Sequence, residues 1–130
     1  MDRTIGWFRI VSIDKDGLQA IEGSCSFGDK NVITIGRTPD NDIQVHNVRV
    51  SKHHAELCRE NQQCFIKDVG SKNGTAVNGE KIDAPRLLKD KDWIVLAGKL
   101  KIIYYEEEPD FKFVIPIHFK GKIKKLSFKV

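Results

Sequence analysis

The sequence lacks most features of membrane and secreted proteins. None of its apolar runs approaches the roughly 18 residues that a membrane span needs, and the amino terminus has no signal-peptide hydrophobic region. Its three cysteines, Cys25, Cys58 and Cys64, are odd in number and include no C-x-x-C pair. We therefore expect a reducing compartment and three small strand residues rather than a disulfide framework, although Cys58 and Cys64 could face each other across a hairpin.

Motifs for catalysis and metal binding are also absent. Residues 70–74 contain glycine and lysine but not the G-x-x-x-x-G-K-[ST] order of a nucleotide-binding loop, and no G-x-S-x-G elbow occurs. His53 and His54 are neighbours, which on a strand point to opposite faces and cannot easily bind one ion. His46 and His118 do not complete a ligand set. We expect no enzymatic activity, no cofactor and no metal.

Charge is unevenly distributed along the chain. The net charge is +4, but residues 1–110 carry 16 basic and 18 acidic residues, whereas residues 111–130 carry six lysines and no acidic residue. The basic character therefore belongs to the carboxyl-terminal segment. It allows nucleic-acid binding there, but we favour lysines that cover the solvent face of a hairpin and discourage edge aggregation.

Short runs rich in Val, Ile, Phe and Tyr recur between turn residues, and helical periodicity is nearly absent. Turn signals include the Asp16–Gly17, Asn73–Gly74 and Asn78–Gly79 pairs. A length of 130 residues suits a single domain, and we predict an all-β, antiparallel β-sandwich of about eleven short strands. The clearest strands are predicted at residues 7–13, 24–27, 32–35, 43–45, 55–59, 64–68, 75–77, 93–96 and 101–105.

The acidic stretch 106–110 is predicted to end the compact domain, at residue 108. Beyond it, Phe111, Phe113, Ile115, Ile117 and Phe119 occupy every second position, so a strand would place them on one face. Residues 109–130 are therefore predicted to form an added β-hairpin, packed on the sandwich or on a partner chain. A homodimer through residues 111–130 is one form of this prediction, and a phosphorylated Thr4 entering a partner's pocket is a related one.

Polar loops between strands carry the candidate binding groups. Arg37 follows Gly36 at the end of one apolar run, Ser51 and Lys52 precede another, and Asn73 lies in a glycine-containing loop. Alone, each has an ordinary explanation as a surface or turn residue. Together, a guanidinium fork, a hydroxyl, an ammonium and an amide are suited to holding a phosphate group.

The order and spacing of these groups resemble a forkhead-associated (FHA) domain, a β-sandwich module that binds phosphothreonine peptides. Gly36–Arg37 is followed after fourteen residues by Ser51 and His54, and then by the Asn73–Gly74 segment. The resemblance extends from about residue 33 to residue 105. It implies that Arg37 and Ser51 grip the phosphate, that Lys52 and Lys72 line the pocket, and that Asn73 pairs with the peptide main chain.

The same resemblance assigns supporting roles. His54 would brace the binding loops from behind, and Gly36 and Gly74 would serve backbone geometry. Lysine at position 52 departs from the arginine that is frequent there; it keeps the charge but loses the bidentate fork. We add the hypothesis that Arg49, two residues before Ser51, reads an acidic side chain about three residues after the phosphothreonine.

The resemblance implies threonine-phosphorylated proteins or peptides as partners. It further suggests a nuclear protein of DNA-damage or cell-cycle signalling, in which this chain would be the amino-terminal domain of a longer mediator-type protein. The alternative is a divergent FHA fold that acts mainly in homodimerisation or nucleic-acid contact. No membrane association is expected.

Overall fold

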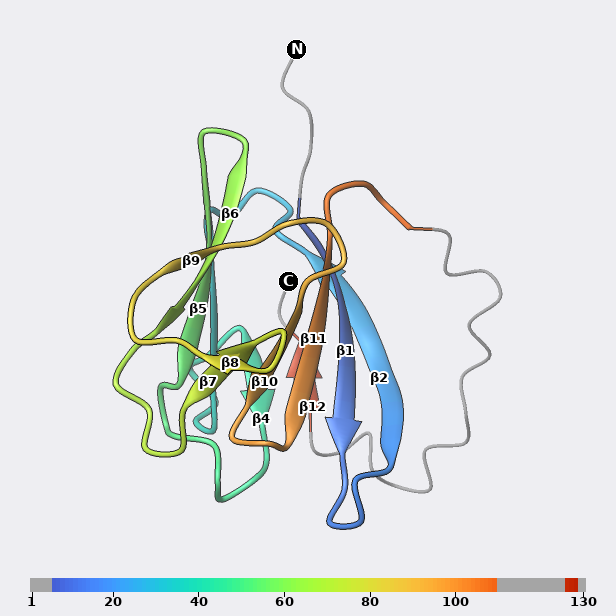
Figure 1. Cartoon of the computed structure of the whole chain (residues 1–130), viewed down its shortest axis with the longest axis vertical. Coiled ribbons are helices and arrows are strands. Elements are labelled where there is room, and N and C mark those ends of the chain that lie inside the picture. Colours follow the sequence, from blue (N-terminus) through green and yellow to red (C-terminus); the bar gives the residue numbers. More distant parts are fainter. Residues whose placement is uncertain (1–5, 110–125, 129–130) are drawn as a thin grey trace.

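Two six-stranded β-sheets form a sandwich (Figure 1). This computed structural model describes residues 6–109 and 126–128. In these ranges no helix has the length and hydrophobicity that crossing a membrane requires. The strands are β1 (Trp7–Ile13), β2 (Gln19–Ser26), β3 (Val32–Gly36), β4 (Ile43–Val45), β5 (Ala55–Glu60), β6 (Gln63–Asp68), β7 (Thr75–Val77), β8 (Glu80–Lys81), β9 (Arg86–Leu87), β10 (Trp93–Leu96), β11 (Leu100–Tyr105) and β12 (Leu126–Phe128).

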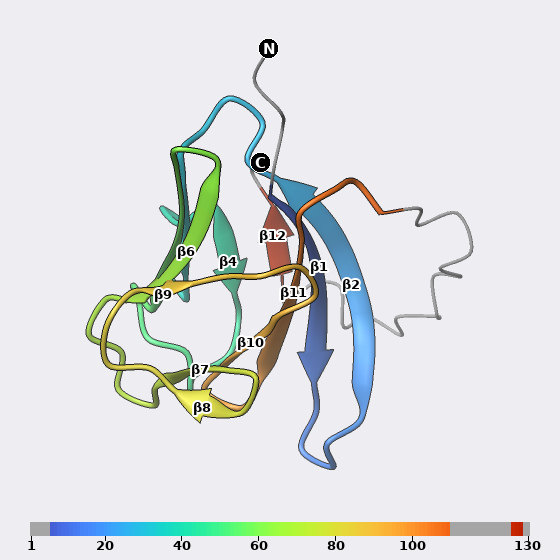
Figure 2. The ribbon, with the colours of Figure 1, turned by 45° about the horizontal axis from the view of Figure 1, so that its top comes forward.

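The two sheets lie face to face (Figure 2). Their strand orders are β2-β1-β11-β10-β7-β8 and β12-β4-β3-β5-β6-β9. The predicted all-β sandwich is confirmed. One pair departs from the antiparallel expectation, because β3 and β4 run parallel, with Ile35 opposite Ile43. The chain therefore crosses from the end of β3 back to the start of β4, which makes residues 37–42 a loop at one end of the sandwich.

The core lies between the sheets and follows the period-2 alternation of the strands. In β11, for example, Leu100, Ile102 and Tyr104 are almost fully buried while the intervening residues are partly exposed. Phe8 packs edge-on against Phe27, with ring centroids 5.4 Å apart. Because each large buried apolar side chain stabilises the fold by roughly 1.5–3 kcal/mol, this core holds the strand ends, and the loops between them, in place.

Cys58 and Cys64 do not face each other, contrary to the sequence-based expectation. In the β5–β6 hairpin Cys58 stands opposite Phe65 and Cys64 stands opposite Arg59, a one-residue offset that sends the two thiols to opposite faces. All three cysteines are free thiols on strands. Burial raises the pKa of Cys25 and of Cys64 to about 12, so both are protonated at neutral pH.

The carboxyl-terminal segment is described only at residues 126–128. There β12 pairs antiparallel with β4, with Leu126 opposite Val45 and Phe128 opposite Ile43. The predicted alternating strand at residues 111–119 lies outside the described residues.

Candidate functional site

Three loops at one end of the sandwich carry every sequence-predicted site residue (Figures 1 and 2). They are the β3–β4 loop (residues 37–42), the β4–β5 loop (residues 46–54) and the β6–β7 loop (residues 69–74). Gly36 ends β3, directly before the first of them. Loops presented by rigid strands are a common place for binding residues.

His54 connects two of these loops to each other and to β3. Its Nδ1 accepts the main-chain N–H of Ser51 at 3.1 Å, and its Nε2–H donates to the carbonyl oxygen of Gly74 at 2.9 Å. Its main-chain N–H donates to Ile35 at 2.9 Å. The side chain is fully buried, and this burial lowers the pKa of His54, although the Gly74 bond and Asp68 oppose the shift. The neutral Nε2–H tautomer therefore completes one hydrogen bond to each of the two loops.

Arg37 is held by the neighbouring loop in a way that leaves the end of its guanidinium available. Its Nε–H donates to the carbonyl oxygen of Val50 at 3.0 Å, and its main-chain N–H donates to Ser51 at 2.9 Å. These contacts fix the side chain beside Ser51. The terminal nitrogens keep the paired donors that match two phosphate oxygens.

Ser51 brings the β6–β7 loop into the site. Its Oγ accepts the main-chain N–H of Lys72 at 2.9 Å. Since a hydroxyl is both acceptor and donor, the Ser51 O–H remains able to donate to an oxygen of a bound anion. Ser51 is half-buried and Lys72 is exposed, so the hydroxyl and the Lys72 ammonium lie at the protein surface.

Asn73 forms a second contact between the β6–β7 loop and the β4–β5 loop. Its Nδ2 donates to the carbonyl oxygen of Arg49 at 2.7 Å, and the main-chain N–H of Arg49 in turn donates to Asn47 Oδ1 at 2.9 Å. The Asn73 side chain is exposed, and its Oδ1 can accept a main-chain N–H from a bound peptide. The Arg49 side chain is exposed next to this contact.

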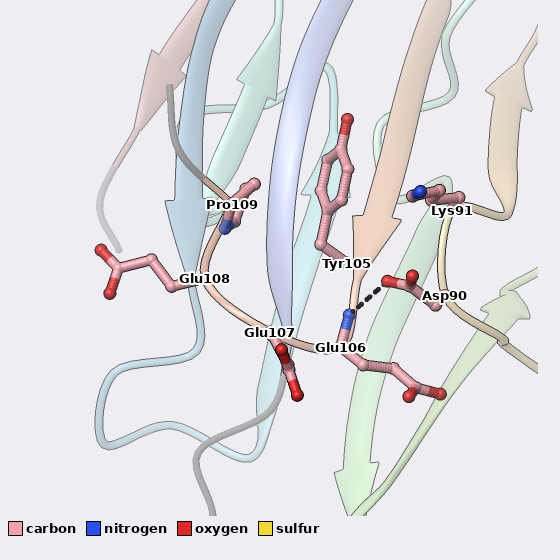
Figure 3. A pocket seen from close by; sticks show the side chains of 7 residues that line it. All are labelled: Asp90, Lys91, Tyr105, Glu106, Glu107, Glu108 and Pro109. Carbon is pink, nitrogen blue, oxygen red and sulfur yellow. Dashed lines mark hydrogen bonds between the residues drawn. The ribbon is translucent and has the colours of Figure 1, made fainter. Parts of the chain in front are cut away.

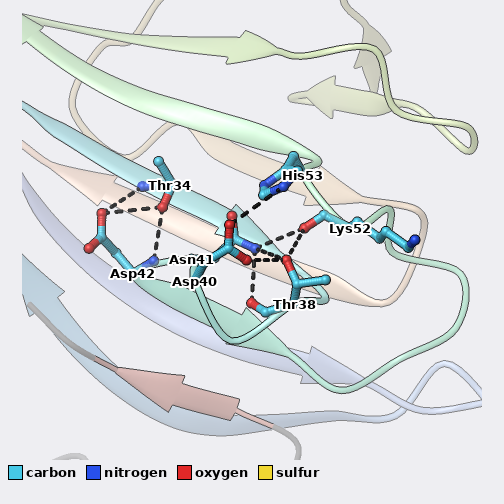
Figure 4. Close-up of polar contacts among 7 residues, drawn as sticks. All are labelled: Thr34, Thr38, Asp40, Asn41, Asp42, Lys52 and His53. Carbon is cyan, nitrogen blue, oxygen red and sulfur yellow. Dashed lines mark hydrogen bonds and ion pairs between the residues drawn. The ribbon is translucent and has the colours of Figure 1, made fainter.

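Lys52 is positioned through its carbonyl oxygen (Figure 4). That oxygen accepts Asn41 Nδ2 at 2.8 Å and Thr38 Oγ1 at 3.1 Å, while the Lys52 ammonium extends away from this cluster. Gly36 packs directly beneath it: a Cβ atom added there would lie 2.1 Å from the same carbonyl oxygen. Glycine at position 36 thus allows the β3–β4 and β4–β5 loops to touch.

The cations of the site are not neutralised within the described part of the chain. Arg37, Arg49, Lys52 and Lys72 take part in none of its ion pairs. Of the two acidic residues of the β3–β4 loop, Asp40 lies 3.5 Å from the His53 imidazole and Asp42 pairs with Lys30. Four cations beside the Ser51 hydroxyl create a positive surface that attracts an anion.

The model of the FHA domain family matches residues 33–97, which is half of the chain. The chain belongs to the FHA family. The match covers all three loops of the site and strands from both sheets of the sandwich. It confirms the family predicted from the sequence, a family of phosphothreonine-binding modules.

Several curated relatives of the FHA domain come from bacteria. The glycogen accumulation regulator GarA of Mycobacterium tuberculosis is 39% identical over 82 residues, which cover 63% of this chain and 49% of the relative. The oxoglutarate dehydrogenase inhibitor of Corynebacterium diphtheriae is 37% identical over 78 residues, covering 60% and 53%. This chain thus spans about half the length of the curated relatives it matches.

A solved structure supports the same assignment. The FHA domain is similar to part of Mycobacterium tuberculosis EmbR in complex with a low-affinity phosphopeptide, with 26% identity and a TM-score of 0.56. The similarity covers 78% of this chain and 26% of EmbR.

The expectation of a nuclear protein is wrong. The matched relatives come from Mycobacterium and Corynebacterium, which are bacteria and have no nucleus. The nuclear prediction came from the association of FHA domains with DNA-damage proteins, and these relatives give that association no support.

Sequence reasoning missed two residues that shape the FHA site. Asn41 is 1% exposed, and its side chain joins the β3–β4 and β4–β5 loops at the Lys52 carbonyl oxygen. Asp68 accepts hydrogen bonds from the main-chain N–H groups of Gly70 and Ser71 and from the hydroxyls of Ser71 and Thr75. Partial burial raises the pKa of Asp68, but these bonds outweigh it and hold the pKa below its usual value. An aspartate whose side chain accepts the main-chain N–H groups two and three residues further along the chain is a known turn motif, and this motif could have identified Asp68.

The FHA domain also has a pocket at the opposite end of the sandwich, where β11 ends (Figures 1 and 3). Asp90 Oδ1 there accepts the main-chain N–H of Glu106 at 3.0 Å. The pocket is lined by Asp90, Lys91, Tyr105, Glu106, Glu107, Glu108 and Pro109. Its four carboxylates make it unsuitable for a phosphate group.

Proposed function

We propose that this FHA domain binds a phosphothreonine of a partner protein on the surface formed by Arg37, Ser51, Lys52, Lys72 and Asn73. One observation carries the proposal: His54 and Ser51 hold the β4–β5 and β6–β7 loops together, and their cations have no acidic partner in the described residues. A phosphate group supplies the missing negative charge.

Each group has a specific part in this binding. The Arg37 terminal nitrogens and the Ser51 hydroxyl donate to phosphate oxygens, and the Lys52 and Lys72 ammonium groups balance the remaining charge. Asn73 pairs with the peptide main chain. Arg49, beside Asn73, reads an acidic side chain about three residues after the phosphothreonine.

The same geometry favours binding over bond cleavage. A serine nucleophile needs a base that takes its proton. His54 is the neighbouring imidazole, but its two nitrogens are engaged by the Ser51 N–H and the Gly74 carbonyl oxygen. The Ser51 hydroxyl is therefore a hydrogen-bond donor to a ligand.

The expected affinity is micromolar. Hydrogen bonds to charged groups contribute roughly 1.5–3 kcal/mol each. Three or four of them, reduced by the cost of ordering a flexible peptide, leave about −8 kcal/mol, which corresponds to a micromolar Kd.

The names of the relatives indicate the kind of process. GarA is a regulator and the corynebacterial protein an enzyme inhibitor. We infer that this chain likewise acts by docking on a phosphorylated partner and altering its activity. A DNA-damage or cell-cycle role has no support among these relatives.

The alternatives of homodimerisation and nucleic-acid contact rested on residues 111–130, of which only 126–128 are described. We keep the division into a domain of residues 1–108 and an added β-hairpin of residues 109–130 as a proposal. The β12–β4 pairing supports packing of this addition on the sandwich.

The decisive experiment compares a phosphothreonine peptide library with its unphosphorylated copy. Wild type should bind only the phosphorylated library, and Arg37→Ala should lose most of this binding while keeping the thermal unfolding profile of wild type. Equal binding of the two libraries, or of neither, would refute the proposal. The same library tests Arg49: a clear apolar preference three residues after the phosphothreonine would contradict its assigned role.

A further inference from the structure

Lys81 lies against the wall of the candidate site, although it belongs to a different element. It is the second residue of β8, and its side chain covers Gly74, the last residue of the β6–β7 loop. A Cβ atom added to Gly74 would lie 3.0 Å from Lys81 Cε and 3.6 Å from Lys81 Nζ. The ammonium group is therefore beside the residue that follows Asn73.

The position of Lys81 is fixed by its short hairpin. Lys81 stands opposite Ala76 in the β7–β8 pair. The next residue, Ile82, is buried and donates its main-chain N–H to Thr75 at 2.9 Å. The backbone on both sides of Lys81 is thus held to β7, so the side chain has a defined starting point next to Gly74.

The charge of Lys81 has no partner within the described residues. Its side chain is exposed, and neither an ion pair nor a hydrogen bond engages its ammonium there. The carboxylate next to it in sequence, Glu80, pairs instead with Arg86 at 3.5 Å. Lys81 therefore adds a fifth uncompensated cation to the rim of the surface that holds Arg37, Arg49, Lys52 and Lys72.

The distance from the phosphate-binding groups sets which part of a ligand Lys81 can reach. Ser51 and Gly74 are separated by the His54 imidazole and one hydrogen bond on each side of it. An extended peptide advances about 3.3 Å per residue. The separation of Ser51 from Gly74 therefore corresponds to about two to three residues of an extended peptide.

We propose that Lys81 is a specificity-determining residue that selects partners with a carboxylate two to three residues from the phosphothreonine. This inference rests on the proposed function, because it needs a peptide already held by Arg37 and Ser51. The main-chain carbonyl oxygen of Arg49 accepts the Asn73 amide from the β4–β5 loop, whereas the Lys81 side chain lies beside Gly74 from β8. Because the two cations start from different elements, we expect them to read different side chains. The preferred partner segment is an acidic one rather than an isolated phosphothreonine.

The test uses a phosphothreonine peptide selected from the library, with glutamate, alanine or lysine placed in turn two and three residues to either side. Affinities are measured for wild type, Lys81→Gln and Lys81→Glu, with Lys67→Gln as control. Lys67 is also an exposed strand lysine, but it lies on β6, and the atoms nearest to a Cβ at Gly74 all belong to Lys81. Arg49→Gln is measured in parallel, and thermal unfolding confirms that each variant is folded.

Wild type should prefer glutamate over alanine about two- to fivefold at one position, as expected for an exposed ion pair. Lys81→Gln should remove that preference, Lys81→Glu should change it to a preference for lysine, and Lys67→Gln should leave it intact. Identical glutamate-to-alanine ratios for wild type and both Lys81 variants would overturn the role of Lys81 while leaving phosphothreonine binding intact. Failure of wild type to bind any phosphothreonine peptide would instead refute the proposed function, and this inference with it.

Discussion

At the scale of single residues, Ser51 joins the β4–β5 loop to the β6–β7 loop and also faces the phosphate site. Its hydroxyl oxygen receives the Lys72 N–H, and its hydroxyl hydrogen remains for the phosphate. Ser51→Ala should weaken phosphopeptide binding by about tenfold to a hundredfold, because a hydrogen bond to a charged group is lost. Isothermal titration calorimetry would measure the change. Ser24→Ala, an exposed serine on β2, is the matched control and should bind as wild type does; equal affinity of Ser51→Ala and wild type would contradict the assignment.

Gly36 acts through the absence of a side chain. An added Cβ would meet the Lys52 carbonyl oxygen at 2.1 Å, and that oxygen belongs to the backbone and cannot move alone. Gly36→Ala should therefore destabilise the domain by about 2–4 kcal/mol, since backbone shifts and lost hydrogen bonds add up. Gly28→Ala is the comparison. Gly28 has open space around it but φ of +58°, so its substitution should cost only about 1–2 kcal/mol. Urea unfolding measures the stability of both variants. Similar losses of stability in Gly36→Ala and Gly28→Ala would show that the close contact at Gly36 is unimportant.

At the scale of elements, the site is a set of loops held by backbone carbonyls. Asn41 donates to the carbonyl oxygens of Lys52 and Thr38, at 2.8 and 3.0 Å. Asn41→Ala should cost about 1–3 kcal/mol of stability and also weaken phosphopeptide binding, because Lys52 and the adjacent Ser51 lose their support. Gln63→Ala, at the start of β6 and at the other end of the sandwich, should change neither. An Asn41→Ala variant that keeps full affinity would show that the β3–β4 loop is not needed to position the site.

The strands were predictable where an apolar run in the sequence ends at the same residues as the strand. Residues 7–13, 43–45, 75–77 and 93–96 match their predicted bounds, since runs of Val, Ile and aromatic residues end there at turn residues. The first half of β2 was missed because residues 19–23 do not alternate cleanly between polar and apolar side chains. The two-residue strands β8 and β9 were missed because they are too short to show any period. The parallel β3–β4 pairing depends on tertiary packing and has no local signal.

The binding residues were predictable from their order in the sequence, but the residues that surround and position them were not. Arg37, Ser51 and Asn73 belong to a spaced pattern. Asn41 instead donates to a carbonyl oxygen eleven residues away, and the Lys81 side chain lies beside Gly74, which belongs to a different element. Any surface lysine or turn asparagine has the same appearance in a sequence. Only the three-dimensional arrangement distinguishes them.

At the scale of the whole molecule, acid stability connects the site to the fold. His54 is buried neutral, so its pKa in the folded state is lower than the 6.5 of the unfolded state. Below about pH 6.5 the unfolded chain therefore binds the proton first, and the stability contributed by neutral His54 is lost as pH falls further. Asp68 and Asp42 have pKa values lowered from 3.8 in the folded state. Their contribution is present above pH 3.8 and is lost only as pH falls through their folded pKa values.

We therefore expect two separate stages of acid destabilisation, the first from His54 below about pH 6.5 and the second from Asp68 and Asp42 below about pH 4. Urea unfolding between pH 7.5 and 5.0 should show stability falling with a slope of up to about 1.4 kcal/mol per pH unit, the limit for one proton. In His54→Gln this slope should largely disappear, while the second stage remains. His53→Gln is the control, because that exposed imidazole lies outside the core, and it should keep the slope. An NMR titration of the His54 ring gives an independent check. A ring that titrates at or above pH 6.5, or parallel stability curves for wild type and His54→Gln, would show that the loops are not held by a neutral imidazole.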